Sequence, residues 1–228
     1  KSYEIINALA NEGILIDLTH MDSEARKDVI SYMKLKNIPP IISHIRIKEM
    51  RQEKHRGLSA KEICEIYKAG GMIGIALGGQ NLEPLPGQRI SSNVEIPENY
   101  CPGTQDSFMV AANYVQKVIK DCAQKILGNK ELTSIDKTRF AFSYGSDWDG
   151  VTVHGAPKFD LCPDKISENK KINNYDMHGL TDPSKLTLMF ESLKKDGLNV
   201  CPFHRSAERF LQIWESLGKK SITSQEVI

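Results

Sequence analysis

The sequence predicts an α/β protein in which buried parallel strands alternate with helices. The first observation is the order of the elements, because short β-rich apolar runs alternate along the chain with segments whose apolar residues recur at helical spacing. This alternation implies parallel strands joined by right-handed crossovers, with the helices packed outside the sheet. The second observation is that the runs are almost wholly apolar, as expected of strands buried on both faces.

Composition and charge narrow the class of protein further. The chain has 228 residues, of which 40% are hydrophobic and 26% are charged, an ordinary balance for a globular domain and too apolar for a disordered one. Thirty basic and 29 acidic residues leave a formal net charge of +1, which argues against a dedicated nucleic-acid-binding protein. No apolar run approaches the roughly 18–20 residues that span a bilayer.

The first half of the chain contains three predicted helices and three predicted strands. Helices are expected from Ser2 to Gly13, after an N-cap at Asp22 with Ala25, Val29, Ile30 and Met33 on its apolar face, and after the capping box formed by Ser59 and Glu62. The predicted strands are 13–20, 40–44 and 71–77, and 46–55 is a polar stretch.

The second half is dominated by helices. Residues 78–103 are rich in Gly, Pro, Asn and Ser and predict a long loop. A helix is expected over about 106–127, a fourth strand over 138–144, a polar loop over about 151–180, and two further helices over about 182–197 and 204–217.

Five scattered cysteines without a CxxC pair exclude a zinc ribbon and a thioredoxin-like motif. A disulfide framework is not expected at this density, although the number allows one or two bridges.

Polar residues stand at the carboxyl ends of the apolar strands. The first strand ends in His20, the second in His44, and the fourth leads into Asp147 and Asp149. In a parallel α/β barrel these ends meet at the active-site face. Imidazole nitrogen and carboxylate oxygen are the usual non-sulfur ligands of zinc, so His20, His44 and Asp147 are candidate metal ligands. A single histidine at a strand end is more often structural, and Asp149 fits a turn, but three such groups at matching ends favour a metal-dependent hydrolase.

Six segments of the chain form a recognisable series: Gly13-Ile-Leu-Ile-Asp-Leu-Thr-His20, Ile41-Ile-Ser-His44, His55-Arg56-Gly57-Leu58, Gly70-Gly71-Met-Ile-Gly74, Gly145-Ser-Asp-Trp-Asp-Gly150 and His178-Gly-Leu-Thr-Asp182. Taken in this order, they resemble the membrane dipeptidase (renal dipeptidase) family. The resemblance implies a (β/α)8 TIM-like barrel of the amidohydrolase type that hydrolyses dipeptides at a two-zinc site. It implies that His20 and His44 bind one zinc ion, and that Asp147 binds the other and handles the proton of the attacking water. Arg56 would bind the substrate carboxylate, and Asp17 would support the site by hydrogen bonding.

Two parts of the family pattern are missing from this sequence. The family carries a His-x-Asp pair on its first strand and a metal-bridging Glu on a later one, and neither is recognisable here. We therefore expect the chain to supply roughly the last four strands and their helices, with 1–228 forming the C-terminal part of a single catalytic barrel domain. The expected partners are a dipeptide, the missing N-terminal half of the barrel and, as in some family members, a second copy in a homodimer. The isolated chain should be poorly active, and the sequence leaves its compartment open.

Two other functions fit the same residues less well. One is a catalytically inactive dipeptidase-like protein that binds or scaffolds, although such decay usually removes the ligands first. The other is a phosphate-binding barrel enzyme that would use Gly78 and Gly79 as an anion cradle. No glycine-rich phosphate fingerprint accompanies that pair.

Overall fold

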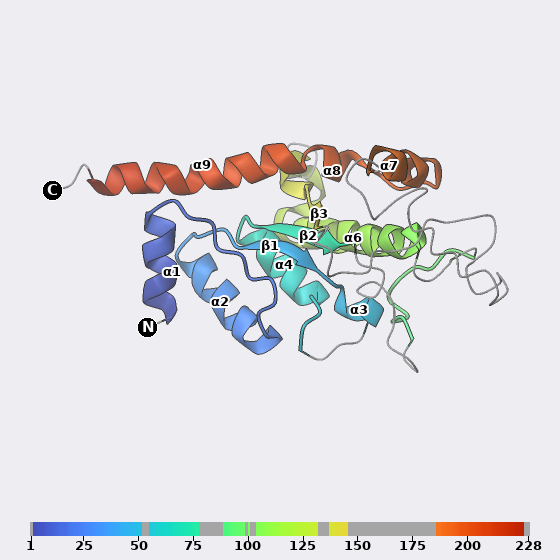
Figure 1. The fold of residues 1–228 in the computed structure, drawn as a ribbon, viewed down its shortest axis with the longest axis horizontal. Helices are drawn as coiled ribbons and strands as arrows, with labels where there is room; N and C mark the ends of the chain where they lie inside the picture. The colour runs from blue at the N-terminus through green and yellow to red at the C-terminus, as the bar shows by residue number, and fades with distance from the viewer. Residues whose placement is uncertain are drawn as a thin grey trace.

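The structure is a computed structural model that describes residues 2–51, 55–77, 89–98, 100, 104–131, 137–145 and 186–225. Its elements follow the order α1 (Ser2–Asn11), α2 (Ser23–Leu35), β1 (Ile41–Ile45), α3 (Lys48–Arg51), α4 (Ala60–Lys68), β2 (Met72–Ala76), α6 (Gln105–Glu131), the 3₁₀ helix η1 (Lys137–Phe140), β3 (Ser143–Gly145), α7 (Leu186–Lys195), α8 (Cys201–His204) and α9 (Ser206–Gln225). Figure 1 shows α9 along one side of the small central sheet and α2 and α4 on the other.

The central sheet is parallel, as the alternation of elements predicts. Its order is β1-β2-β3, with Ile42 opposite Ile73 and Ile75 opposite Tyr144. Helix α4 lies in the connection between β1 and β2, and α6 lies in the connection between β2 and β3. Strand β2 is buried along its whole length, which explains its apolar sequence.

The prediction of a full strand over 13–20 is wrong, so the described residues contain three of the four expected strands. The fourth, expected over 138–144, is a strand only at Ser143–Gly145, because Lys137–Phe140 form the 3₁₀ helix η1. The segment 13–20 makes only an isolated parallel bridge between Asp17 and Ile41. The Leu18 N–H donates to the Ile41 carbonyl at 2.8 Å, but the Ser43 N–H donates to Asp17 Oδ1 at 3.1 Å and to Thr19 Oγ1 at 3.0 Å. Side chains therefore take the place of the backbone acceptor that would have extended the ladder.

Several predicted helix starts and stops agree with the structure where it describes them. The last predicted helix, over about 204–217, is wrong in its bounds, because the structure has α8 over Cys201–His204 and α9 over Ser206–Gln225. Asp22 caps α2 by accepting the Glu24 N–H at 2.9 Å, and Ser59 and Glu62 form both bonds of the capping box of α4. The helical conformation of α6 breaks at Gly128, whose φ of 70° is accessible to glycine. The expected helix start at 182–183 lies outside the described residues, and α7 is described from Leu186.

The short helix α3 was not predicted. The stretch 46–55, which is polar in composition, contains α3 and hides Ile47 and Met50, both fully buried. Ile47 forms a parallel bridge with Leu58, so this segment folds back over the start of α4. Two apolar residues in a polar stretch were too weak a signal to predict the helix.

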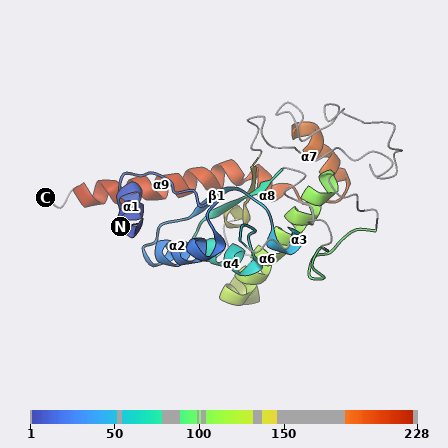
Figure 2. The same cartoon turned by 60° about the horizontal axis from the view of Figure 1, so that its bottom comes forward.

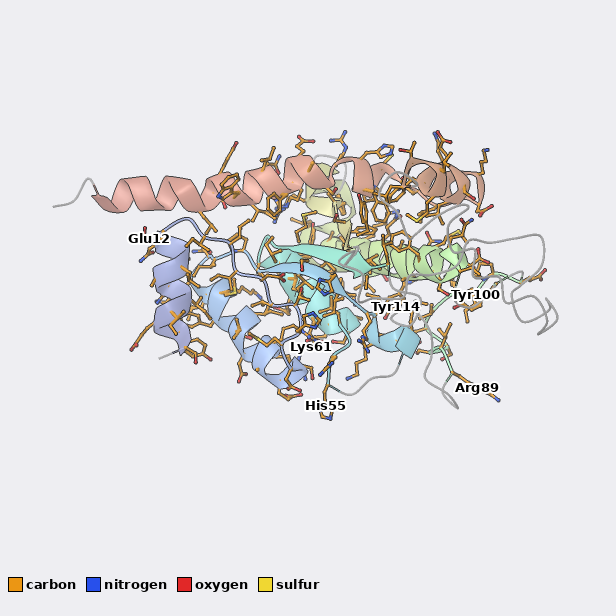
Figure 3. All side chains as sticks on the ribbon, in the orientation of Figure 1. Glu12, His55, Lys61, Arg89, Tyr100 and Tyr114 are labelled. Carbon is orange, nitrogen blue, oxygen red and sulfur yellow. A yellow bond between two sulfur atoms is a disulfide. The ribbon has the colours of Figure 1, made fainter. Side chains whose placement is uncertain are left out.

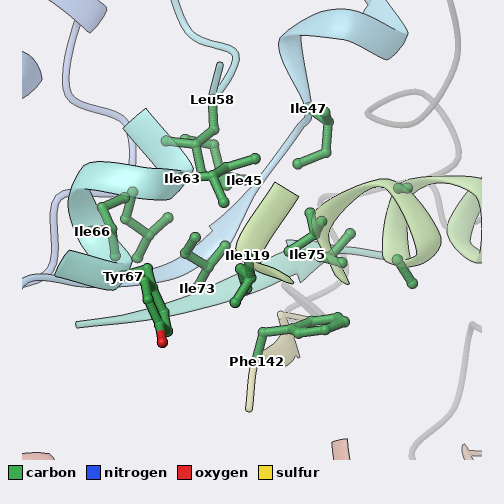
Figure 4. Packing of buried hydrophobic residues seen from close by; sticks show 14 of the residues in the cluster. Ile45, Ile47, Leu58, Ile63, Ile66, Tyr67, Ile73, Ile75, Ile119 and Phe142 are labelled. Carbon is green, nitrogen blue, oxygen red and sulfur yellow. The ribbon is translucent and has the colours of Figure 1, made fainter. Parts of the chain in front are cut away.

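The core lies between the sheet and the helices that cross it. Figure 4 shows Ile73 and Ile75 of β2 packed among residues of α4 and α6, including Ile63, Ile66 and Ile119. A second set of contacts involves Phe108, Phe142, Phe190 and Phe203, whose rings pack edge-on or tilted. A disulfide between Cys64 and Cys122 joins α4 to α6, within the one or two bridges that the composition allows.

The C-terminal helix closes the amino ends of the strands. Ile213 of α9 packs with Ile41 and Met72 at the beginnings of β1 and β2. The N-terminal helix α1 lies beside the far part of α9 (Figure 2). None of the helices in the described part of the chain is both long and apolar enough to cross a bilayer. The opposite, carboxyl ends of the strands carry the candidate site.

Candidate metal site

The two predicted histidine ligands meet at the carboxyl end of the sheet. His44 lies in β1, and His20 lies in the turn that follows the Asp17–Ile41 bridge. Their Nε2 atoms are 3.1 Å apart, and their rings meet edge to face with centroids 4.9 Å apart. His20 is exposed and His44 is half-buried, so the pair is open to solvent on one side. The structure therefore brings these two of the three predicted ligands together.

The turn that carries His20 has an unusual backbone. His20 adopts a φ of 65°, in the left-handed region that few residues other than glycine occupy. A non-glycine residue keeps this conformation only when its surroundings hold it there. The adjacent residues do so, because the Thr19 N–H and hydroxyl both bond to Asp17 Oδ1, at 3.0 and 2.7 Å.

The two glycines of the neighbouring strands bring the backbone close to His44. A Cβ added at Gly74 of β2 would collide with the carbonyl oxygen of Ser43. A Cβ at Gly145 of β3 would collide with the same oxygen and with the Cβ of His44. The pairing of β1 with β2 shifts register between Ile42 and Ile45, so the irregular part of β1 contains Ser43 and His44. Only glycine permits that approach.

The carboxylate of Asp17 accepts hydrogen bonds from Thr19 and Ser43, the residues that precede the two histidines. Desolvation, the largest single effect, would raise the pKa of Asp17. The side-chain and backbone hydrogen bonds from Ser43 and Thr19 act in the opposite direction and hold the pKa below its ordinary value. Asp17 is therefore an anion at neutral pH, and its negative charge would favour a cation bound near the two histidines.

Arg56 lies in the segment that runs beside the start of α2. The Ser23 N–H donates to the His55 carbonyl at 2.9 Å, and His55 Nδ1 lies 3.6 Å from Asp22 Oδ2. This places the backbone of residues 55–57 next to the chain that leaves His20. The side chain of Arg56 is exposed, and that of His55 points outward from the body of the protein (Figure 3). The role of Arg56 in substrate binding stays a prediction.

A buried arginine that the sequence analysis missed connects these two segments. Arg26 is fully buried in α2, with Nη2 2.8 Å and Nε 3.0 Å from Glu62 Oε1. Its remaining N–H groups donate to the carbonyls of Met21, Arg56 and Gly57 at 3.0, 3.4 and 2.9 Å. The signal was present in the sequence, because residue 26 shares a helix face with Val29, Ile30 and Met33, where a charged side chain needs a buried partner.

Asp147, the third predicted ligand and the predicted catalytic group, lies outside the described residues, as do Asp149, Gly78 and Gly79. Within the described ranges, no group of three or more His, Cys, Asp or Glu side chains is arranged to hold a metal ion. The described part of the site is therefore a pair of imidazoles on a hydrogen-bonded support.

The pair nevertheless fits a zinc-like ion. Two nitrogen ligands at about 2.0–2.1 Å from a tetrahedral ion lie roughly 3.3 Å apart. The observed separation of 3.1 Å between the two Nε2 atoms is close to that value. The exposed side of His20 leaves room for further ligands and for water. Such an arrangement suits a metal-dependent hydrolytic site.

Comparisons of the structure with solved structures find dipeptidase folds. A dipeptidase AC, described as a metallopeptidase of family M19, superposes with a TM-score of 0.52 at 15% identity, over 93% of this chain and 45% of its own. An amidohydrolase from Pseudomonas aeruginosa superposes with a TM-score of 0.54 at 16% identity, over 94% of this chain and 55% of its own. The probable dipeptidase PvdM from Pseudomonas aeruginosa superposes with a TM-score of 0.54 at 16% identity, over 95% of this chain and 54% of its own.

These comparisons bear out the resemblance noted from the sequence motifs at the level of the fold. The sequence itself matches no family model and no curated protein. The chain spans about half the length of the solved structures that it matches.

Proposed function

We propose that this chain is the C-terminal part of a zinc-dependent dipeptidase, which hydrolyses the peptide bond of dipeptides at a site shared with a missing N-terminal half. The observation that carries the proposal is the 3.1 Å approach of His20 Nε2 to His44 Nε2 at the carboxyl end of a parallel sheet. The similarity of the fold to dipeptidase and amidohydrolase structures supports it. The two imidazoles would hold one of two zinc ions, and Asp147 would serve as a ligand of the other.

The barrel is also part of this proposal. The described sheet has three parallel strands, and the segment at Asp17 adds a bridge to one of its edges. A complete (β/α)8 barrel needs about 250 residues, slightly more than this chain contains. The half-length matches to solved structures support the idea that a second half supplies the remaining strands.

Each residue would have a distinct task in the reaction. A bound ion would lower the pKa of a water ligand and polarise the scissile carbonyl. His20 and His44 would hold that ion through Nε2. Asp147 would accept the proton of the attacking water and return it to the leaving amine. Arg56 would bind the free carboxylate of the dipeptide with its two-pronged guanidinium, which orients the peptide bond.

The metal part of the proposal is tested by equilibrium dialysis of the chain against Zn²⁺ with elemental analysis of the protein fraction. We expect weak binding, because a pair of imidazoles is only part of a site, and we expect its loss in His20→Ala and in His44→Ala. His204→Ala is the matched control, because His204 is an exposed histidine at the end of α8. Equal zinc binding by the unsubstituted chain, His20→Ala and His44→Ala would contradict the assignment of these two histidines as ligands.

The catalytic part is tested on the complete natural polypeptide. We expect hydrolysis of dipeptides that a chelator abolishes and zinc restores, with Asp147→Ala lowering kcat and Arg56→Ala mainly raising KM. A full-length protein that binds zinc but leaves dipeptides intact would favour the inactive binding or scaffold protein instead.

A further inference from the structure

Four polar side chains form a continuous hydrogen-bonded line that ends on His44. Thr19 Oγ1 lies 2.7 Å from Asp17 Oδ1, and Ser43 Oγ lies 3.1 Å from Thr19 Oγ1. His44 Nδ1 lies 3.0 Å from Ser43 Oγ. The line therefore runs from a carboxylate, through two hydroxyls, to the ring nitrogen of His44 that faces away from His20.

The direction of each hydrogen bond follows from the number of protons available. Ionised Asp17 only accepts, so the single hydroxyl proton of Thr19 points to Asp17. On the side away from His44, Ser43 Oγ faces two acceptor oxygens, Thr19 Oγ1 and the Asp17 carboxylate, and this arrangement favours the direction of its proton toward them. With that proton used, Ser43 Oγ can only accept from His44. His44 Nδ1 must then carry a hydrogen.

The reverse arrangement leaves an electrostatic conflict. If Ser43 donated to His44 Nδ1, its oxygen lone pairs would face Thr19 Oγ1, whose own proton points to Asp17, at 3.1 Å. Two acceptors would then oppose each other beside a carboxylate. The lowered pKa of Asp17 keeps that carboxylate charged at neutral pH, which strengthens the preference for the first direction.

We propose that Asp17, Thr19 and Ser43 are positioning residues that fix neutral His44 in the Nδ1–H tautomer and so leave its Nε2 lone pair facing His20. In a neutral imidazole, protonation of one ring nitrogen leaves the other as an acceptor or metal ligand. The tautomer itself is a property of the metal-free chain. Its use, to present Nε2 to an ion, rests on the proposed metallopeptidase function.

The same residues also orient the backbone around both histidines. Thr19 Oγ1 accepts the Ser43 N–H at 3.0 Å, and Asp17 Oδ1 accepts the N–H groups of Thr19 and Ser43 at 3.0 and 3.1 Å. Thr19 precedes His20, and Ser43 precedes His44. The hydroxyl before each histidine thus links the turn at His20 to strand β1 and limits the movement of one ring relative to the other.

The test is nitrogen-15 NMR of the ring-labelled, metal-free chain at about pH 8.5, so that the spectrum reports neutral imidazole rings. We expect the His44 ring in the Nδ1–H form. In Ser43→Ala it should move toward the Nε2–H form that a free imidazole side chain prefers, and in Ser43→Thr, which keeps the hydroxyl, it should stay. Thr19→Val and Thr19→Ser form a second matched pair. An Nε2–H tautomer in the unsubstituted chain would overturn the proposal even if no variant folds.

Metal affinity provides the second readout. Loss of the supporting hydrogen bond should weaken Co²⁺ or Zn²⁺ binding roughly 10–100-fold in Ser43→Ala, with recovery in Ser43→Thr. If the His44 tautomer changes in Ser43→Ala but the chain binds no metal, the positioning role of Asp17, Thr19 and Ser43 is supported and the metallopeptidase function is contradicted. If the chain binds metal through His20 and His44 but the His44 tautomer is unchanged in Ser43→Ala, the positioning role is contradicted and the metallopeptidase function is not affected.

Discussion

Arg26 and Glu62 form an ion pair in the interior of the protein, with Arg26 Nη2 2.8 Å from Glu62 Oε1 and both side chains almost completely buried. Glu62 is also the capping-box residue of α4, where its Oε2 accepts the N–H and hydroxyl of Ser59. The pair therefore joins the start of α4 to α2. Through three backbone carbonyls, it also holds the segment after His20 against the segment that contains Arg56.

Removing one member of this pair should be strongly destabilising. In Arg26→Met, Glu62 Oε1 loses its cationic partner and the carbonyls of Met21 and Gly57 lose the guanidinium donor, and we expect a loss of about 3–5 kcal/mol in the free energy of unfolding, measured in urea. Lys27→Met is the matched control, because Lys27 pairs with Glu24 in solvent and should have a far smaller effect.

A double substitution separates the cost of leaving one buried charge unpaired from the cost of changing the packing around it. Arg26→Met combined with Glu62→Leu should be less destabilising than the sum of the two single changes, because neither charge is then buried alone. Strict additivity of the two effects would contradict the description of this pair as coupled.

The approach of β2 to β1 predicts a specific effect of Gly74→Ala. The new methyl group would meet the Ser43 carbonyl and push the His44 segment away, costing roughly 1–3 kcal/mol of stability and weakening zinc binding. Gly197→Ala is the control, because a Cβ there meets nothing within 4 Å and only its φ of 98° is unfavourable. That variant should lose some stability and keep its zinc affinity. Equal zinc affinity in both variants would argue against the close approach.

The lowered pKa of Asp17 predicts a dependence of stability on pH. A carboxyl group whose pKa is lower in the folded chain than its ordinary value of 3.8 stabilises the fold above that value, and loses the contribution as the pH falls through the folded pKa. Asp17→Asn should therefore be less stable than the unsubstituted chain at pH 7, and the difference should shrink below about pH 4. Urea unfolding of both proteins across this range measures it, and a difference that grows on acidification would contradict the assigned direction.

The Cys64–Cys122 bond should contribute measurably to stability. It joins α4 and α6 across a separation of 58 residues, and the loss of such a cross-link costs about 2–4 kcal/mol. Cys64→Ala should show this loss, whereas Cys201→Ala should have little effect, because Cys201 is an exposed free thiol. Peptide mapping without reductant checks the bond directly, and recovery of Cys64 and Cys122 as free thiols would remove the expected difference.

The isolated chain should hydrolyse dipeptides poorly or not at all. The sequence lacks the His-x-Asp pair and the bridging Glu expected from the resemblance, and its fold matches only about half of each solved dipeptidase-like structure. We expect little release of amino acids from the 228-residue chain in the presence of zinc. Rapid hydrolysis that a chelator stops and zinc restores would show that this half alone suffices.

Much of the local structure was predictable because it depends on neighbours in sequence. The N-cap at Asp22, the capping box at Ser59 and Glu62, and the end of the long helix near 127 require only side chains that reach their own backbone, or a glycine that adopts a positive φ. The parallel sheet followed from the alternation of strands and helices.

The predicted strand over 13–20 was wrong because of contacts between this segment and β1. Its apolar residues are typical of a strand, but Asp17 and Thr19 take the Ser43 N–H and end the ladder after Leu18. Whether a polar side chain replaces a backbone acceptor depends on its distance from the neighbouring strand, and that distance is not encoded in either segment alone.

The sequence by itself determined which residue types stand at the ends of the strands, and hence that His20 and His44 were candidates for one site. Only the tertiary structure decided that their Nε2 atoms meet at 3.1 Å, that a line of hydroxyls leads from Asp17 to His44, and that buried Arg26 binds the backbone carbonyls of Met21 and Gly57. The physical reason is that hydrogen bonds act over about 3 Å, and the order of residues along the chain does not specify which distant groups come that close.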